Sequence, residues 1–408
     1  MAVAPGSLES LRRVNRARVL AVLQRRGRAS RADIVRASGL SRTTVSSLVA
    51  DLLEEGVVVE RPDPVLQAPT SSGGRPPILL ALDPASGTFV GIDFGHDSVN
   101  VALADRSGDL LANAREELDV DYQADLALAT ATRIVRGLLD NAGISPKRVL
   151  GVGAAVSAPL RSRDHAFASQ RIFPGWAALD VSRALGSRLG LPVYVGNDAN
   201  LGALAEATFG AGRDVQNLIY VMLSSGVGAG IILDGALYEG DTGTAGELGH
   251  VVVDPSGPIC RCGNRGCLET LAGVSALTRA LQHRDETTPT LAGLLALCEA
   301  GDPGVRRLIA DAGRAVGQAL AAMCSVLDPA LVIVGGELAT ADGVLLDAIR
   351  EMIDQRTAPA PGHPYKVVRG ALADKAEVLG AVALAMITAA SGQPDVATAG
   401  GQLDATTA

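Results

Sequence analysis

The chain has 408 residues, of which 48% are hydrophobic and 20% are charged, as in soluble globular proteins. This length is too great for one compact core, so we expect two or three domains. The sequence has no run of about 18 uninterrupted apolar residues and no apolar signal core near its N-terminus. These features exclude a membrane span and predict a cytoplasmic protein.

Charge is distributed unevenly along the chain. Residues 1–80 hold twelve Arg and seven Asp or Glu, a balance of +5, whereas the remainder holds 24 basic and 37 acidic residues, a balance of −13. A basic module on an acidic body indicates a nucleic-acid partner at one end only.

After a segment expected to be disordered (residues 1–10), residues 11–82 show the pattern of a winged helix-turn-helix. Helical spacing, capping serines and stop glycines predict three helices, and two apolar runs predict a two-stranded wing. The expected elements are helices at Val14–Leu23, Arg31–Ala37 and about Ser41–Glu55, and strands at Val57–Val59 and Ile78–Leu82.

The third helix is the expected DNA reader, because its outward side chains are short or basic and can bond bases or phosphates. These are Ser41, Arg42, Thr43, Thr44, Ser46 and Ser47. Arg75, in the loop between the two strands, could reach a minor groove. The alternative is a plain scaffold or dimer module. The basic balance, the capped third helix and the Gly-Arg-Pro wing together favour DNA binding.

After Asp83-Pro84 the pattern changes to alternating strands and helices, which predicts α/β lobes with helix-covered sheets. We expect a first lobe at residues 83–196, a second at 197–390 with a closing C-terminal helix, and a disordered tail at 391–408. The expected strands are Phe89–Asp93, Val99–Ala104, Val149–Val156, Leu191–Gly196, Leu218–Leu223, Ile231–Leu233 and Leu331–Val334, and the expected helices are about Gln123–Asn141 and Gly304–Leu327.

Three glycine-containing segments follow strands and could bring backbone amides to a phosphate. They contain Asp93 and Gly95, then Ser225, Gly226 and Gly228 within the loop expected at 224–230, then Gly335 and Gly336. Asp93 could hold Mg²⁺ or position water. Each segment alone is more often an ordinary turn. Their order along the chain favours a phosphate-binding layout.

Asn197 and Asp198 follow an expected strand, where a carboxylate facing a cleft can accept a proton from a sugar hydroxyl. The alternative for this pair is a helix N-cap.

Three of the five cysteines fall within eight residues. Together with His250, the thiols of Cys260, Cys262 and Cys267 match a closed structural zinc site, in which no ligand position remains for water. The alternative is unconnected buried thiols.

The sequence resembles the ROK family (repressors, open reading frames and sugar kinases) over essentially residues 10–390. The resemblance is carried by Gly74-Arg75-Pro76, Asp93-Phe94-Gly95, Pro174-Gly175-Trp176, Asn197-Asp198-Ala199-Asn200, residues 225–230, Gly246-Glu247-Leu248-Gly249-His250 and residues 260–269. It implies a two-lobed, actin-like (ribonuclease H-like) sugar-kinase body, and the winged helix is similar to that of the family's repressor branch.

The resemblance also implies residue roles. Sugar hydroxyls would be contacted by Asn197, Asp198, Glu247, His250 and Glu269. Asp198 would be the base if phosphorylation occurs, and His250 would place one ring nitrogen on zinc and the other toward the sugar. The alternative for the two glutamates is a solvated surface position. Their location on either side of the His/Cys cluster argues against that alternative.

Two segments depart from the family's kinase pattern. Gly95 is followed by His96-Asp97-Ser98, and the charge of Asp97 would repel ATP. Ser157-Ala158-Pro159 stands where kinases usually carry Pro-Gly. We therefore expect a regulator that binds a sugar rather than ATP and Mg²⁺. The resemblance to the family's repressor branch implies a repressor of carbohydrate genes, with an activator as the alternative, that acts as a homodimer or higher homo-oligomer on palindromic operator DNA. The alternatives are an ATP-dependent sugar kinase with a DNA-binding arm and a sensor of a phosphosugar.

Overall fold

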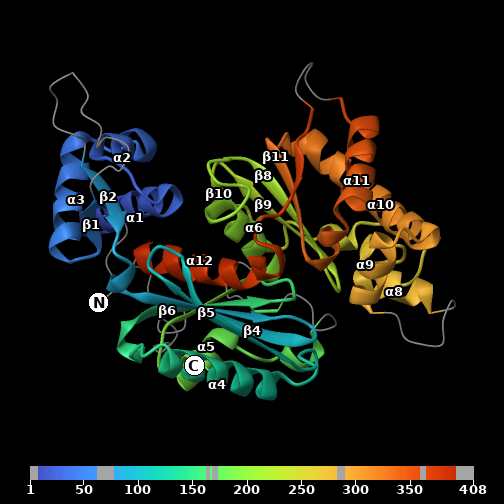
Figure 1. Cartoon of the computed structure of the whole chain (residues 1–408), viewed down its shortest axis with the longest axis horizontal. Coiled ribbons are helices and arrows are strands. Elements are labelled where there is room, and N and C mark those ends of the chain that lie inside the picture. The colour runs from blue at the N-terminus through green and yellow to red at the C-terminus, as the bar shows by residue number, and fades with distance from the viewer. Residues whose placement is uncertain are drawn as a thin grey trace, which may run out of the picture.

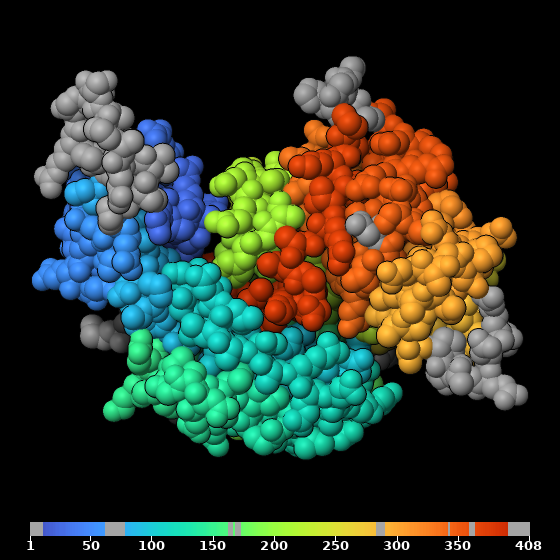
Figure 2. Space-filling model, in the orientation of Figure 1, coloured from blue at the N-terminus to red at the C-terminus, as the bar shows by residue number. Residues whose placement is uncertain are grey.

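The computed structural model describes residues 8–61, 78–161, 166–167, 173–282, 290–358 and 364–391. These residues form an N-terminal module and two lobes, which Figure 1 shows in blue, in cyan to green, and in green to orange. The space-filling view shows the N-terminal module as a separate body seated on the first lobe (Figure 2). Within the described residues, no helix combines the length and apolarity needed to cross a membrane.

The N-terminal module is a winged helix-turn-helix. Its elements are α1 (Leu8–Arg26), α2 (Arg31–Ser38), α3 (Arg42–Glu54), β1 (Val58–Arg61) and β2 (Leu79–Leu82). The Ser41 hydroxyl caps α3 by accepting from Thr44 N at 3.1 Å, and Gly39 ends α2 at φ 70°. Helix α1 begins at Leu8, inside the stretch expected to be disordered. The loop with Arg75 lies outside the described residues.

The first lobe contains a five-stranded mixed sheet. Its elements are β3 (Thr88–Phe94), β4 (Ser98–Asp105), β5 (Leu110–Glu117), α4 (Ala124–Asn141), β6 (Val149–Val156), α5 (Val181–Leu189) and β7 (Val193–Asn197). The strand order is β5-β4-β3-β6-β7, with β3 antiparallel to β4 and parallel to β6. Val90, Ile92 and Phe94 alternate along β3 and pack against α4 and α5. Strand β5 was not predicted.

The second lobe repeats this topology. Its elements are β8 (Leu218–Leu223), β9 (Val227–Leu233), β10 (Ala236–Leu237), α7 (Glu269–Ala272), α8 (Val274–Leu281), α9 (Leu291–Glu299), α10 (Pro303–Leu327), β11 (Leu331–Gly335), α11 (Asp342–Arg356) and β12 (Val367–Arg369). The strand order is β10-β9-β8-β11-β12, so both sheets follow the order 3-2-1-4-5 when strands are numbered within each lobe. This duplication confirms the actin-like fold expected from the resemblance.

Helices α6 (Asp198–Thr208) and α12 (Ala376–Ser391) lie between the two sheets. Helix α12 was expected in the second lobe, but it packs on the sheet of the first. Glycines make this close approach possible: a Cβ on Gly91 would lie 2.2 Å from Val378 O, and one on Gly153 would lie 1.8 Å from Ala381 O. The helix therefore contacts β3 and β6 directly and runs toward the N-terminal module (Figure 1).

The N-terminal module contacts both lobes through α1. Arg213 of the second lobe donates to Arg25 O at the C-terminal end of α1. Arg106 of the first lobe lies beside Arg16, whose guanidinium bonds Glu55 at 2.7 Å. Ala390, near the end of α12, packs against the module's own core. The module is thus attached to each lobe and to the helix between them.

Candidate effector cleft, metal centre and DNA-binding helix

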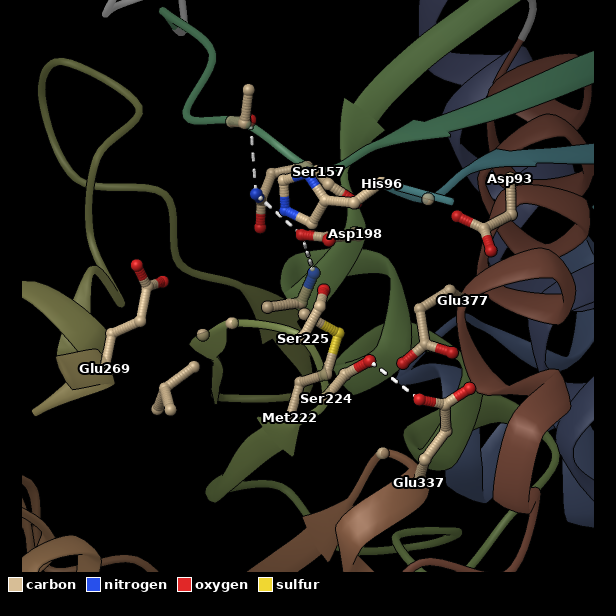
Figure 3. A pocket seen from close by; sticks show the side chains of 18 of the residues that line it. Asp93, His96, Ser157, Asp198, Met222, Ser224, Ser225, Glu269, Glu337 and Glu377 are labelled. Carbon is tan, nitrogen blue, oxygen red and sulfur yellow. Dashed lines mark hydrogen bonds between the residues drawn. The ribbon is translucent and has the colours of Figure 1, made fainter. Parts of the chain in front are cut away.

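A cleft between the lobes collects the five side chains expected to contact a sugar. Asn197 and Asp198 come from the junction of β7 and α6 in the first lobe, and Glu247, His250 and Glu269 come from the second. Figure 3 shows Asp198 and Glu269 lining this space from opposite sides. Residues separated by more than 70 positions in sequence therefore meet at one site.

Asp198 is the first residue of α6. Asn197 is the N-cap of that helix, because its Oδ1 accepts from Asn200 N at 3.1 Å. The Asp198 carboxylate instead accepts from Ala199 N at 2.7 Å and from Asn197 Nδ2 at 3.0 Å. Burial raises the pKa of Asp198, and a hydrogen bond from Ser157 opposes that rise. The capping alternative thus applies to Asn197 and leaves Asp198 facing the cleft.

Glu247 and Glu269 are not solvated surface charges, since their side chains are 32% and 16% exposed. Burial and the charges of Asp198 and Glu269 raise the pKa of Glu247 to about 7. Glu269 is held by Arg261, whose Nε lies 3.2 Å from its Oε1. The cleft therefore offers several carboxylate oxygens at close range, a set suited to accepting hydrogen bonds from hydroxyl groups.

The other half of the cleft, where nucleotide phosphates were considered, is rich in carboxylates. Burial, together with the charge of Glu377, raises the pKa of Asp93 well above its usual range. The acidic residues of the whole cleft lining are Asp93, Asp97, Asp198, Glu247, Glu269, Glu337, Asp374 and Glu377. The arginines of that lining are Arg115 and Arg261, and each is paired with a carboxylate. Such a lining disfavours a polyphosphate.

The loop in the second glycine segment is shorter than the loop predicted at 224–230. Strand β9 begins at Val227, so the turn is confined to residues 224–226. Gly228 and Gly230 lie in the strand because α6 packs closely against it: a Cβ on Gly230 would lie 2.5 Å from the Ala203 Cβ. Packing against α6 therefore explains the glycines at 228 and 230, and Gly228 also lines the cleft. Gly95, Ser225, Gly226 and Gly336 line the cleft, whereas Gly335 ends β11 against Tyr220.

The four expected metal ligands lie together. One ligand atom from each of His250, Cys260, Cys262 and Cys267 falls within 4.8 Å of the others. Cys262 Sγ is 3.7 Å from Cys267 Sγ, and Cys260 Sγ is 3.5 Å from His250 Nδ1. A tetrahedral zinc site requires S···S of about 3.8 Å and S···N of about 3.5 Å, given Zn–S of about 2.3 Å and Zn–N of about 2.0–2.1 Å. The donor set and its spacing therefore fit such a metal.

The loop that carries these ligands is held by close backbone contacts. Gly263 N donates to Cys260 O at 2.9 Å, and Cys260 N donates to Asn264 O at 2.8 Å. A Cβ on Gly266, at φ +68°, would lie 1.5 Å from Asp254 O. The other ring nitrogen of His250, Nε2, is 3.8 Å from Glu247 Oε2 and faces the cleft. Burial and the neighbouring sulfurs raise the pKa of the Cys267 thiol to about 12, and a bound cation would favour the thiolate.

Helix α3 presents the expected DNA-reading face. Val45, Leu48, Val49 and Leu52 are buried in the module. Thr44 is half-buried, and the remaining expected residues, Ser41, Arg42, Thr43, Ser46 and Ser47, are exposed. A row of small polar side chains beside Arg42 can approach a groove closely and form hydrogen bonds there.

Comparison with known proteins identifies the lineage. The ROK family pattern matches residues 89–387, most of the chain. The chain belongs to the ROK family. A MarR family pattern matches residues 12–65, which include most of α1, all of α2 and α3, and strand β1. Both matches confirm the resemblance that the sequence motifs carried.

Several ROK relatives match along nearly their full length. The chain is 29% identical over 374 residues to a xylose repressor of Bacillus subtilis (strain 168), covering 91% of this chain and 94% of that protein. It is 28% identical over 391 residues to an N-acetylglucosamine repressor of Escherichia coli O157:H7, covering 93% and 94%.

Solved ROK structures share the fold. A ROK family transcriptional regulator, described as a homologue of the E. coli MLC protein, is 26% identical with a TM-score of 0.76, covering 94% of this chain and 98% of that one. A ROK family glucokinase from Streptomyces griseus, in complex with glucose and AMPPNP, is 28% identical with a TM-score of 0.65, covering 73% and 99%.

Several residues of this ROK cleft were not predicted as site residues. Arg115 lies 3.6 Å from Asp97 and 3.8 Å from Glu337, so it bridges the two lobes. Glu377 enters from α12 and accepts from the Tyr220 hydroxyl at 3.1 Å. Neither belongs to a motif. A signal did exist for His96, because it stands in a segment that departs from the family's kinase pattern.

Proposed function

We propose that this ROK protein is a DNA-binding transcriptional repressor whose affinity for operator DNA is set by a sugar bound between its lobes. The observation that carries the proposal is the presence, in one chain, of an exposed reading helix and a cleft with five convergent sugar-contact candidates. Support comes from repressor relatives that match over 90% or more of this chain. The sugar would bind one lobe arrangement more tightly than the other and so shift the module.

Zinc is the metal that we assign to His250, Cys260, Cys262 and Cys267. All four protein positions are filled, so the metal would order the loop rather than activate water. Because His250 would bind the metal through Nδ1, its Nε2 would be oriented toward the cleft. The metal would thereby position a sugar-binding group without taking part in a reaction.

A homodimer on a palindromic operator is the arrangement that we propose for DNA binding. A twofold dimer would place two copies of α3 on successive turns of the major groove. Arg42 would contribute a phosphate or base contact, and Arg75 would extend the interface from the wing.

The decisive test separates sugar binding from DNA binding in the zinc-loaded full chain. Thermal unfolding would be followed with D-xylose, N-acetyl-D-glucosamine and D-glucose, each with and without ATP and Mg²⁺. A ligand at about 100 times its dissociation constant stabilises the folded state by roughly 2.7 kcal/mol. We expect stabilisation by a sugar, no further stabilisation by ATP, and weaker operator binding when that sugar is present.

Two variants serve as reciprocal controls for this test. Glu247→Ala should remove the sugar response and leave operator binding intact, whereas Arg42→Ala should weaken operator binding and leave the sugar response intact. A chain stabilised by no sugar would contradict the effector half of the proposal. Phosphorylation of a sugar that Asp198→Asn abolishes would instead establish the kinase alternative, which the position of Asp198 supports.

A further inference from the structure

The loop between β3 and β4 places a histidine in the cleft beside Asp198 (Figure 3). His96 Nδ1 lies 2.6 Å from Asp121 Oδ1, and the two side chains are 17% and 23% exposed. An ionised carboxylate only accepts hydrogen bonds, so Nδ1 carries the hydrogen and donates to Asp121. This orientation leaves Nε2 as the ring nitrogen available to a ligand.

The Asp121 segment is itself held by the Pro174-Gly175-Trp176 turn. Gly175 N donates to Asp121 O at 2.9 Å, and Trp176 Nε1 donates to Val120 O at 2.7 Å. Glycine is needed at 175, because a Cβ there would lie 2.7 Å from Asp121 O. This motif carries part of the family resemblance, and it lies outside the set of residues in the proposed function.

Aromatic packing completes the support for the imidazole. His96 meets the Phe173 ring edge-on, with centroids 5.8 Å apart, and Phe173 is fully buried. Val120 N also donates to His96 O at 3.1 Å. The backbone of His96 is therefore fixed by the same segment that orients its ring. A polar ring held this firmly at the edge of a cleft can form a directed hydrogen bond at low entropic cost.

The surrounding charges indicate what the ring would contact. His96 and Asp198 line the same part of the cleft, and Asp198 is a buried carboxyl. With Asp121 on one nitrogen and Asp198 nearby, an anionic ligand group is disfavoured at Nε2. A neutral hydroxyl suits the position, since it can donate to or accept from imidazole.

We propose that His96, positioned by Asp121, is a sixth effector-binding residue that forms a hydrogen bond through Nε2 to a hydroxyl of the sugar held at Asp198. The inference rests on the proposed sugar-binding function. It makes the hairpin after β3 a determinant of sugar selectivity in this chain.

The test is a thermodynamic cycle. The His96 side chain is removed by substitution and single sugar hydroxyls are removed by the use of deoxy sugars, separately and together. The sugar that stabilises the wild-type chain most, among D-xylose, N-acetyl-D-glucosamine and D-glucose, would be titrated by calorimetry together with its monodeoxy derivatives. His96→Ala should lower affinity for the parent sugar roughly 2- to 12-fold, the range for one hydrogen bond. One monodeoxy sugar should bind wild type more weakly than the parent sugar does, by the same factor. The His96→Ala variant should bind that monodeoxy sugar as well as it binds the parent sugar. His96→Gln should recover part of the affinity.

Asp121→Ala supplies a second variant, and Asp125→Asn is its matched control. Asp121→Ala should weaken binding through the same hydroxyl only, whereas Asp125, whose side chain is 93% exposed, should have no effect. Equal losses for every deoxy sugar on wild type and His96→Ala would overturn the inference while leaving the proposed function standing. If wild type binds no sugar at all, both fail together.

Discussion

At the scale of single residues, the cleft is dominated by carboxylates whose charges are costly to bury. Glu377 is partly buried at the edge of the cleft, and desolvation, with the charge of Asp198, raises its pKa to about 7. Its oxygen accepts from Tyr220, a neutral donor, at 3.1 Å. Because the pKa is raised on folding, the stability that protonated Glu377 contributes is fully present below about pH 4.5 and is lost as pH rises through about 7.

Glu377→Gln should therefore flatten the dependence of stability on pH. The amide keeps the acceptor for Tyr220 and cannot ionise. We expect the variant to gain on the order of 1–3 kcal/mol relative to wild type between pH 5.5 and pH 8. Chemical denaturation of the zinc-loaded chain across that interval measures the difference. Parallel pH profiles for the two chains would show that Glu377 is ionised in the folded protein throughout.

The cleft residues that lie in compact motifs could be predicted from the sequence. Those that enter the cleft only through tertiary packing could not. Asp198, Glu247 and His250 follow strands or flank the cysteines, so their positions were predictable. Arg115 lies in a strand whose alternation is interrupted by exposed Leu110 and Leu111, and the strand itself was overlooked. The role of a residue such as Glu377 depends on where its helix packs, which no local pattern encodes.

At the scale of elements, the loop that carries His250, Cys260, Cys262 and Cys267 is the segment whose order we expect to depend most on a bound ion. It contains no helix or strand long enough to be stable alone, and it is held by turns and isolated bridges. His250, one of the four candidate metal ligands, also borders the cleft. Loss of the metal should therefore disturb the cleft before it disturbs the sheets, whose cores lie elsewhere.

Cys262→Ser should reduce bound zinc and weaken sugar binding. A hydroxyl is a poor substitute for thiolate at a zinc site, because thiolate is the ligand that such sites select. Metal content by mass spectrometry and sugar affinity by calorimetry are the measurements. Cys298→Ser is the matched control, since Cys298 is a buried thiol outside the cluster. Undiminished zinc in Cys262→Ser would remove this residue from the ligand set.

Element packing also explains where the predicted fold was inaccurate. Glycines in the segment 224–230 were interpreted as a loop, although two of them are strand residues that admit α6. Periodicity identifies a strand or helix and its inward face. It does not reveal whether a glycine serves a ligand or a neighbouring helix, nor which lobe a terminal helix such as α12 will cover.

At the scale of the whole molecule, the N-terminal module contacts both lobes of the body. The second lobe holds the C-terminal end of α1 through Arg213, and the first lobe packs beside Arg16 and Leu20 of the same helix. A change in the angle between the lobes must therefore alter at least one of these contacts. The position of α3 depends on α1, against which it packs through the shared core of the module.

Arg213→Ala should uncouple the sugar from DNA. Sugar affinity and operator affinity should each stay within about twofold of wild type, because the contact is exposed and exposed contacts contribute about 0–1 kcal/mol. The change in operator affinity caused by sugar should shrink. Fluorescence anisotropy with labelled operator, with and without sugar, measures this; Arg133→Ala, which removes a surface pair far from the module, is the control. An undiminished sugar effect would place the coupling elsewhere.

The attachment of α1 to both lobes has a consequence for the sugar itself. If closing the cleft changes operator affinity by some factor, then occupancy of the operator must change sugar affinity by the same factor, typically about 5- to 150-fold. Operator DNA thus acts as a second ligand that changes the affinity of the protein for the sugar. Copies of the protein bound to operator DNA and copies free in solution would respond at different sugar concentrations. The same protein would therefore have two threshold concentrations of sugar.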